Sequence, residues 1–297
     1  MRSQNAASRV LGVDTRPAPI DESHLEASGG LKINELNAPI SNNRATLDVG
    51  PREVRSSLSV STAVILAGGS GLRLAPLTNN VPKALVRIRS KPLLEWVIQW
   101  LRSNRIRNLV VGIAYEKEKI VGYFGDGTGF GVQIKYSVHS VEGGTAEGFR
   151  RAIKRHVKDE TFLAMNGDEL TNLNVRNLYE LHATSGAIAT VAVTPFKSPF
   201  GLVKLDSNGH VMIFEEKVTI PDTYVSIGVY AFEREILDYI PNRGDIERTT
   251  FPALSRMKRL QAYRHDGFWA TVNNLKELQE AEENIERIFA QGTRLFI

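Results

Sequence analysis

The sequence predicts an α/β fold in which a mixed, mostly parallel sheet is flanked by helices on both faces. Two observations predict it. From residue 61 onward, short apolar runs alternate with segments of helical spacing, and this βαβ rhythm is typical of parallel sheets covered by helices. Glycine-rich or aspartate-containing loops follow two of the apolar runs, at the strand ends where ligands bind in such sheets.

The expected elements follow one another along the chain. Strands are expected over residues 63–66, 108–114, 132–138, 161–165 and 187–193. Helices are expected over residues 92–102, 116–124, 145–156, 174–184 and 275–290. The first helix opens with Pro92, which suits a first helical turn, and its Leu93, Val97 and Trp100 share one face. Turn residues at 206–209 predict added β-hairpins between about 200 and 232.

Composition excludes several classes of protein. The 297 residues are 42% hydrophobic and 24% charged, with a formal net charge of +4 and no cysteine. Disulfides, thiolate nucleophiles and cysteine metal sites are therefore excluded, and no basic run interleaved with aromatics suggests nucleic-acid binding. No apolar run approaches the ~20 residues that a membrane helix needs. These features fit a cytoplasmic enzyme with no membrane partner.

Residues 1–60 differ in pattern from residues 61–297. They are rich in Ser, Asn, Ala, Pro and charge, lack Phe, Tyr and Trp, and are predicted to form a flexible or loosely docked extension. A local strand or turn is expected at 30–36. No apolar segment of the secretory type follows Met1, and acidic residues disfavour a transit peptide. Residues 61–297 are expected to form one catalytic domain.

The first expected strand runs into the loop Gly68-Gly69-Ser70-Gly71, which Arg73 and Lys83 follow. Glycines let backbone N–H groups approach phosphate oxygens, while arginine and lysine add a planar fork and a mobile charge. A P-loop would need a lysine directly after the last glycine, and a dinucleotide fingerprint would need a third glycine where Leu74 stands. The loop is therefore predicted to hold the phosphates of a nucleotide.

The stretch Ala63 to Leu85, which reads AVILAGGSGLRLAPLTNNVPKAL, closely resembles the signature of the sugar-1-phosphate nucleotidylyltransferases. The resemblance extends, with gaps, from about residue 62 to the C-terminus. It implies a Rossmann-like, glycosyltransferase-A-like fold with the hairpins on the sugar side. It also implies Mg²⁺ as cofactor and a nucleoside triphosphate (NTP) and a sugar-1-phosphate as substrates. Whether the protein forms a homo-oligomer stays open.

The resemblance assigns roles to the glycine-loop region. Arg73 and the loop amides of residues 69–71 would hold the leaving pyrophosphate. Lys83 would contact the α-phosphate or the incoming sugar phosphate. Leu66 and Gly68 would lie against the nucleoside.

Two positions are candidate metal ligands. Asp168 stands at the end of an apolar strand, where a carboxylate is a natural Mg²⁺ ligand, and it matches the metal aspartate of the family. Many relatives carry a second aspartate after a tryptophan near the C-terminus. Here Asn273 is the candidate, because the Val-Asn-Asn string resembles the N-acetylglucosamine-1-phosphate uridylyltransferases. Asn273 as the cap of the last helix is the alternative.

Two further segments resemble substrate-binding segments of the family. Gly144 and Thr145 would pack against the base, and His139 stands where relatives often place glutamine or glutamate to read the base edge. The identity of the base stays open.

The sugar side is expected around four residues. Gly201 would approach the sugar, Glu216 would accept its hydroxyls and Lys217 would meet its phosphate. Ser226 replaces the asparagine of a family segment, so one sugar contact is shortened or lost.

Two alternatives stay open. The same fold serves cytidylyltransferases that use phosphocholine-like acceptors, and it also serves catalytically silent subunits that sense nucleotide sugars. The retained Arg73, Lys83 and Asp168 argue against a silent subunit.

Overall fold

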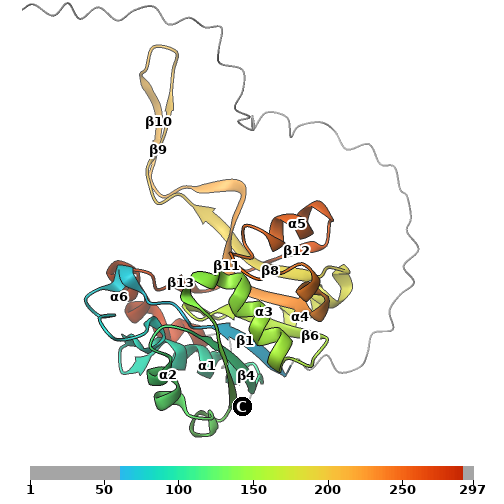
Figure 1. Cartoon of the computed structure of the whole chain (residues 1–297). Helices are drawn as coiled ribbons and strands as arrows, with labels where there is room; N and C mark the ends of the chain where they lie inside the picture. Colours follow the sequence, from blue (N-terminus) through green and yellow to red (C-terminus); the bar gives the residue numbers. More distant parts are fainter. Residues whose placement is uncertain (1–60, 290–297) are drawn as a thin grey trace, which may run out of the picture. The chain divides into compact units, whose positions relative to one another are not determined.

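The structure is a computed structural model that describes residues 61–289. Its centre is a seven-stranded sheet with the strand order β12-β8-β11-β6-β1-β4-β5 (Figure 1). The strands are β1 (Thr62–Leu66), β4 (Asn108–Ile113), β5 (Gln133–Val138), β6 (Thr161–Asn166), β8 (Ala189–Lys197), β11 (Thr219–Glu233) and β12 (Leu260–Arg264). β11 runs antiparallel to its neighbours β6 and β8, whereas the other pairs are parallel. The prediction of a mixed, mostly parallel sheet is confirmed.

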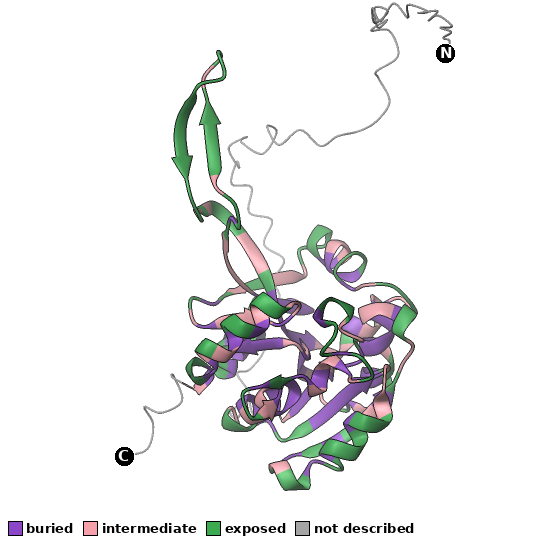
Figure 2. Cartoon of the chain, turned by 90° about the vertical axis from the view of Figure 1, so that its left-hand side faces the viewer, coloured by how far each residue is buried: buried purple, intermediate pink, exposed green. Residues whose placement is uncertain are grey.

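Helices cover both faces of this sheet. They are α1 (Leu93–Ser103), α2 (Lys117–Phe124), α3 (Gly144–His156), α4 (Val175–Ser185), α5 (Thr250–Arg256) and α6 (Leu275–Asn284). Side chains of β1 alternate between two buried clusters: Ala63 and Ile65 pack with α1, α2, α4 and α6, and Val64 packs with α3 and α5. Because side chains point to opposite faces with a period of two, this alternation gives the domain three layers, with the buried strands in the middle (Figure 2).

An aromatic cluster fills the face of the sheet that α3 and α5 cover. The Phe232 ring lies 5.9 Å from Phe149 and 6.1 Å from Phe162, both edge to face. Phe232 is fully buried. Such aromatic pairs add about 0.5–1.5 kcal/mol each beyond area burial, so this cluster stabilises the packing of α3 on the sheet.

Three short antiparallel pairs extend from the central sheet. They are β7 (Glu169–Thr171) with β13 (Trp269–Thr271), β2 (Arg87–Ile88) with β3 (Lys91–Pro92), and β9 (Leu202–Leu205) with β10 (Val211–Glu215). The β9–β10 hairpin is the one that the turn residues predict, and both strands are exposed throughout (Figure 2). The remaining helical segments are 3₁₀ turns: Leu72–Leu74, Lys83–Leu85, Thr128–Phe130, Val141–Gly143, Arg234–Asp238 and Ile285–Phe289.

Some element boundaries differ from the sequence-based prediction. The strand expected at 187–193 runs from Ala189 to Lys197 because β11 continues the ladder as far as Thr219. The last helix changes to a 3₁₀ turn at Ile285, which buries Ile285 and Ile288 in the core. The predicted extension over 1–60, with its strand or turn at 30–36, lies outside the described residues. Among residues 61–289, no helix has the length and apolar character needed to span a bilayer.

Candidate active site

Three side chains from distant parts of the chain meet at the end of β6. The Nζ atom of Lys83 donates to Asp168 Oδ2 at 2.5 Å and to Asn273 Oδ1 at 2.8 Å. The Lys83 and Asp168 side chains are only 13% and 26% exposed. A solvated surface lysine, the usual role of lysine, is therefore excluded for Lys83. The structure brings together the predicted lysine and both predicted metal ligands.

The pairing of β7 with β13 explains why these residues meet. Asp168 precedes β7 and Asn273 follows β13, and the ladder places Thr271 opposite Glu169. Because the two strands run in opposite directions, the residues just before one and just after the other are neighbours. Asn273 is held by two further bonds: its Nδ2 donates to Thr271 Oγ1 at 2.8 Å, and its backbone N–H donates to Glu277 Oε2 at 2.7 Å. These bonds aim Oδ1 at Lys83.

The helix cap is the residue after Asn273. The Asn274 side chain accepts the Glu277 backbone N–H at 3.0 Å and caps α6. The alternative that Asn273 caps the last helix is therefore wrong, and its side chain is available to the site.

Glu169 is a buried acid beside this cluster that the sequence analysis missed. Its Oε2 accepts from Trp269 Nε1 at 2.8 Å. A Cβ at Gly228 would lie 2.8 Å from Glu169 Cγ, so Gly228 allows the close packing. Burial, followed by the nearby charge of Asp168, raises the pKa of Glu169 well above its usual value. Glu169 could have been identified from the sequence because it directly follows Asp168.

The donor set suits a hard divalent cation. A carboxylate oxygen and an amide oxygen, Asp168 Oδ2 and Asn273 Oδ1, converge on one cationic group, and Mg²⁺ prefers such oxygen ligands. No group of three or more His, Cys, Asp or Glu side chains forms a metal cluster within residues 61–289. An ion here would need substrate oxygens to complete its shell, as is usual for Mg²⁺ bound with phosphates.

The glycine loop packs directly against Lys83. Gly71 has φ +68°, and a Cβ there would lie 3.0 Å from Lys83 Cβ. Thr78 Oγ1 donates to the Gly71 carbonyl at 2.9 Å and holds the loop in place. A Cβ at Gly69 would meet no atom within 4 Å, and the Ser70 hydroxyl forms no hydrogen bond to a described residue. The loop is thus an open cradle beside the lysine.

Arg73 lies on the exposed side of this cradle. It belongs to the 3₁₀ turn Leu72–Leu74 and is exposed. It forms no ion pair with any described residue, so its guanidinium is available for an anion.

The predicted base-reading residue lies over the start of the loop. A Cβ at Gly68 would lie 2.6 Å from His139 Nε2, and a Cβ at Gly148 would lie 2.9 Å from Leu66 Cδ2 and 3.5 Å from His139 Cε1. The structure therefore groups Leu66, Gly68 and His139. His139 Nδ1 lies 3.0 Å from the Ser140 carbonyl, and its buried Nε2 has no hydrogen-bond partner among residues 61–289.

Gly144 and Thr145 begin α3 and also contact the loop at 242–249. Gly144 has φ +67°, and a Cβ there would lie 2.3 Å from the Gly244 carbonyl oxygen, so only glycine fits. Thr145 Oγ1 donates to Glu247 Oε2 at 2.7 Å and accepts from the Ile246 N–H at 2.9 Å. The Thr145 hydroxyl is therefore occupied by this loop.

Two of the sugar-side candidates, Gly201 and Glu216, lie together at the base of the β9–β10 hairpin. A Cβ at Gly201 would lie 2.8 Å from Glu216 Oε2. Lys217 is exposed, and Ser226 Oγ accepts from the Gly228 N–H at 3.3 Å. None of the four hydrogen-bonds to Lys83, Asp168 or Asn273 within the described part of the chain.

Comparisons with known proteins identify the family of the chain. The family model described as nucleotidyl transferase matches residues 62–288. Over 211 residues, the chain is 35% identical to the UTP--glucose-1-phosphate uridylyltransferase of Synechocystis sp., covering 65% of this chain and 54% of that protein. It is 32% identical over 240 residues to the mannose-1-phosphate guanylyltransferase of Mycobacterium tuberculosis, covering 78% of this chain and 67% of that protein. The chain thus spans about half the length of the first relative and two thirds of the second.

A solved structure shares the fold. The crystal structure of HddC from Yersinia pseudotuberculosis superposes with a TM-score of 0.61 at 20% identity, covering 76% of this chain and all of the other.

Proposed function

Because the chain belongs to the nucleotidyl transferase family, we propose that it makes a nucleotide sugar from an NTP and a sugar-1-phosphate. A phosphate oxygen of the sugar-1-phosphate would attack the α-phosphorus of the NTP. The bond from the α-phosphorus to the bridging oxygen breaks, and pyrophosphate leaves with the electron pair. The meeting of Lys83, Asp168 and Asn273 beside an open glycine loop is the observation that carries this proposal.

Charge stabilisation is the main task of the residues in such a transfer. The amides of residues 69–71 and the exposed Arg73 would bind the leaving pyrophosphate. The Cβ of Lys83 packs against Gly71, and its ammonium reaches the acid Asp168. It would neutralise the α-phosphate as the new bond forms.

Asp168 and Asn273 would hold Mg²⁺, which when bound neutralises phosphate oxygens and orients the triphosphate. The bonds from Asn273 to Thr271 and Glu277 keep the amide oxygen turned toward the site before substrate arrives.

His139 would select the nucleobase, and the residues where the β9–β10 hairpin begins and ends would select the sugar. His139 Nε2 is buried and without a protein partner among residues 61–289, and buried polar atoms rarely stay unpaired. A hydrogen bond to the base edge would satisfy it. The relatives named above differ in both base and sugar. The proposed substrates are therefore an NTP and a hexose-1-phosphate, with neither the base nor the hexose specified.

Pyrophosphate release tests this function. Full-length protein with Mg²⁺ is assayed against the four common NTPs, each with several hexose-1-phosphates and with phosphocholine. We expect turnover with at least one NTP and hexose phosphate, and its loss in Asp168→Ala. Asp238→Ala is the matched control, because Asp238 is exposed and forms no hydrogen bond or ion pair with a described residue.

Three outcomes would contradict the proposal. Turnover with phosphocholine alone would favour the cytidylyltransferase alternative. Binding of a nucleotide sugar without any turnover would favour the silent subunit. Full activity in Asp168→Ala would remove Asp168 from the reaction.

A further inference from the structure

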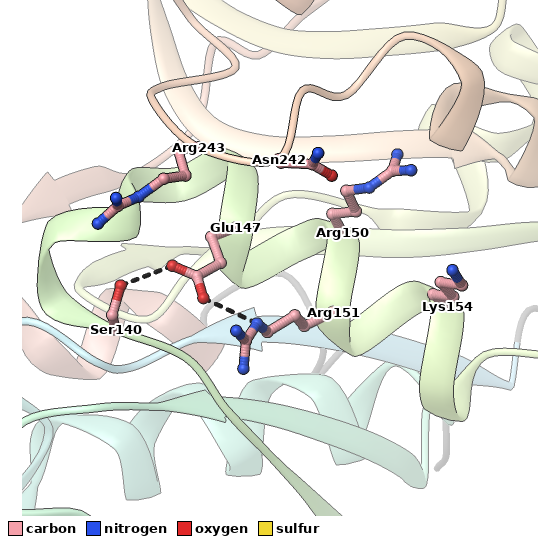
Figure 3. Close-up of a pocket in the computed structure, with 7 residues that line it drawn as sticks. All are labelled: Ser140, Glu147, Arg150, Arg151, Lys154, Asn242 and Arg243. Carbon is pink, nitrogen blue, oxygen red and sulfur yellow. Dashed lines mark hydrogen bonds and ion pairs between the residues drawn. The ribbon is translucent and has the colours of Figure 1, made fainter.

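A basic pocket of about 570 Å³ lies beside helix α3, away from the glycine loop in sequence (Figure 3). Arg150, Arg151 and Lys154 of α3 line it, with Lys154 about one turn after the adjacent arginines, and Arg243 comes from the loop that faces the helix. Glu147 and Ser140 also line it. None of the three α3 cations has a role in the proposed transfer.

The charges in this pocket do not cancel. Glu147 is already engaged, because its Oε1 lies 2.7 Å from Arg151 Nε and its Oε2 accepts from Ser140 Oγ at 2.6 Å. Lys154 and Arg243 form no ion pair with a described residue. The lining side chains carry four positive charges against one negative charge, so the pocket has a net charge of +3.

One of the cations is fixed in place without being neutralised. Arg150 Nη1 donates to the carbonyls of Leu237 and Ile240 at 2.7 and 2.9 Å. Backbone carbonyls orient the guanidinium but leave its full charge and its other N–H groups for a ligand. Arginines held in this way suit phosphate, which they bind through paired N–H groups.

We propose that this pocket binds a phosphorylated small molecule other than the two substrates, and that its binding regulates the nucleotide site. The volume lies within the roughly 300–1,000 Å³ typical of small-ligand pockets. A net charge of +3 on the lining side chains favours a ligand with two phosphate groups over a monoanion.

The backbone connects this pocket to the base-reading segment. The Gly244 N–H donates to the Gly143 carbonyl at 2.9 Å, and the Ala146 N–H donates to the Gly244 carbonyl at 2.8 Å. Arg243 directly precedes Gly244. A ligand that contacts Arg243 together with the cations of α3 would therefore hold the loop against the start of α3, where Gly144 and Thr145 lie. This regulatory step rests on the proposed function, whereas binding itself does not.

Calorimetric titration of the full chain tests the site. The probes are inorganic phosphate and fructose 1,6-bisphosphate, which carries no phosphate on its anomeric carbon and so differs from a sugar-1-phosphate. We expect saturable bisphosphate binding that survives a saturating NTP, and weaker binding of phosphate. Lys154→Glu should weaken bisphosphate binding about tenfold by charge reversal. Arg155→Glu makes the same charge change on the next residue, outside the pocket, and should leave it unchanged.

The assay separates failure of the site from failure of the function. Absent binding, displacement by NTP, or equal weakening in both variants would overturn the site even if turnover is found. If turnover is found, the bisphosphate should shift the KM for NTP in wild type and Arg155→Glu but not in Lys154→Glu. An unchanged KM despite binding would overturn the regulatory step alone. Binding without turnover under any condition would leave the site standing and reject the proposed function.

Discussion

At the scale of single residues, Asn273 is the least usual member of the site. Its neutral amide oxygen occupies a position facing Lys83 and Asp168, and a neutral ligand binds Mg²⁺ less tightly than a carboxylate does. We predict that Asn273→Asp lowers the Mg²⁺ concentration needed for half-maximal pyrophosphate release about tenfold, and that Asn273→Ala raises it. Asn208→Asp, on the exposed hairpin turn, serves as control. Unchanged Mg²⁺ dependence in both variants would exclude Asn273 as a ligand.

We expect Glu147 to make the stability of the fold depend on pH. The Ser140 hydroxyl, with a further contribution from Arg151, holds its pKa below the ordinary value of 4.5. A depressed folded-state pKa stabilises the fold above the unfolded value, and this stabilisation is lost as pH falls through the folded value. Melting temperatures measured from pH 6 down to pH 3.5 should therefore fall more steeply in wild type than in Glu147→Gln below about pH 4.5. Parallel curves would contradict this assignment.

At the scale of elements, the β9–β10 hairpin contributes little to the core. Its strands are exposed throughout, while Gly201 and Glu216 lie together at its base. We predict that replacing residues 204–213 with an Asn-Gly turn changes the melting temperature by less than about 2 °C, as expected for surface changes. The KM for sugar-1-phosphate should stay unchanged, whereas Glu216→Gln should raise it. A raised KM in the shortened protein would place sugar contacts on the hairpin itself.

The aromatic cluster between α3 and the sheet should, unlike the hairpin, contribute strongly to the stability of the fold. Phe232 is fully buried and contacts four other rings, so Phe232→Ala should reduce the free energy of unfolding by about 3–5 kcal/mol. Phe200, which is 74% exposed, provides the matched control, and Phe200→Ala should change it by less than about 0.5 kcal/mol. Urea denaturation measures both. Similar losses in the two variants would contradict the packing described here.

At the scale of the whole molecule, repeated patterns could be predicted from sequence and single contacts could not. The alternation of strands and helices follows from hydrophobic periodicity, and the glycine loop follows from its residue types. The meeting of Lys83 with Asp168 and Asn273 spans 85 and 190 positions. It was predictable only through the resemblance to a family.

The residues that support the site carried no such signal. Glu169 and Thr271 depend on the pairing of β7 with β13, whose three-residue strands are too short for periodicity to reveal. Glu277 holds the backbone of Asn273 only because α6 begins one residue after Asn274. These contacts depend on tertiary placement rather than on local sequence.

The proposed reaction is attack on the α-phosphorus at the site formed by Lys83, Asp168 and Asn273. The direct measurement follows NTP labelled with ³²P at the α-phosphate through a reaction with the preferred hexose-1-phosphate and Mg²⁺. We predict that the label enters the nucleotide sugar while unlabelled pyrophosphate is released, and that Asp168→Ala forms neither product. Label recovered only in free nucleotide, or a γ-phosphate transferred to the sugar, would contradict attack on the α-phosphorus.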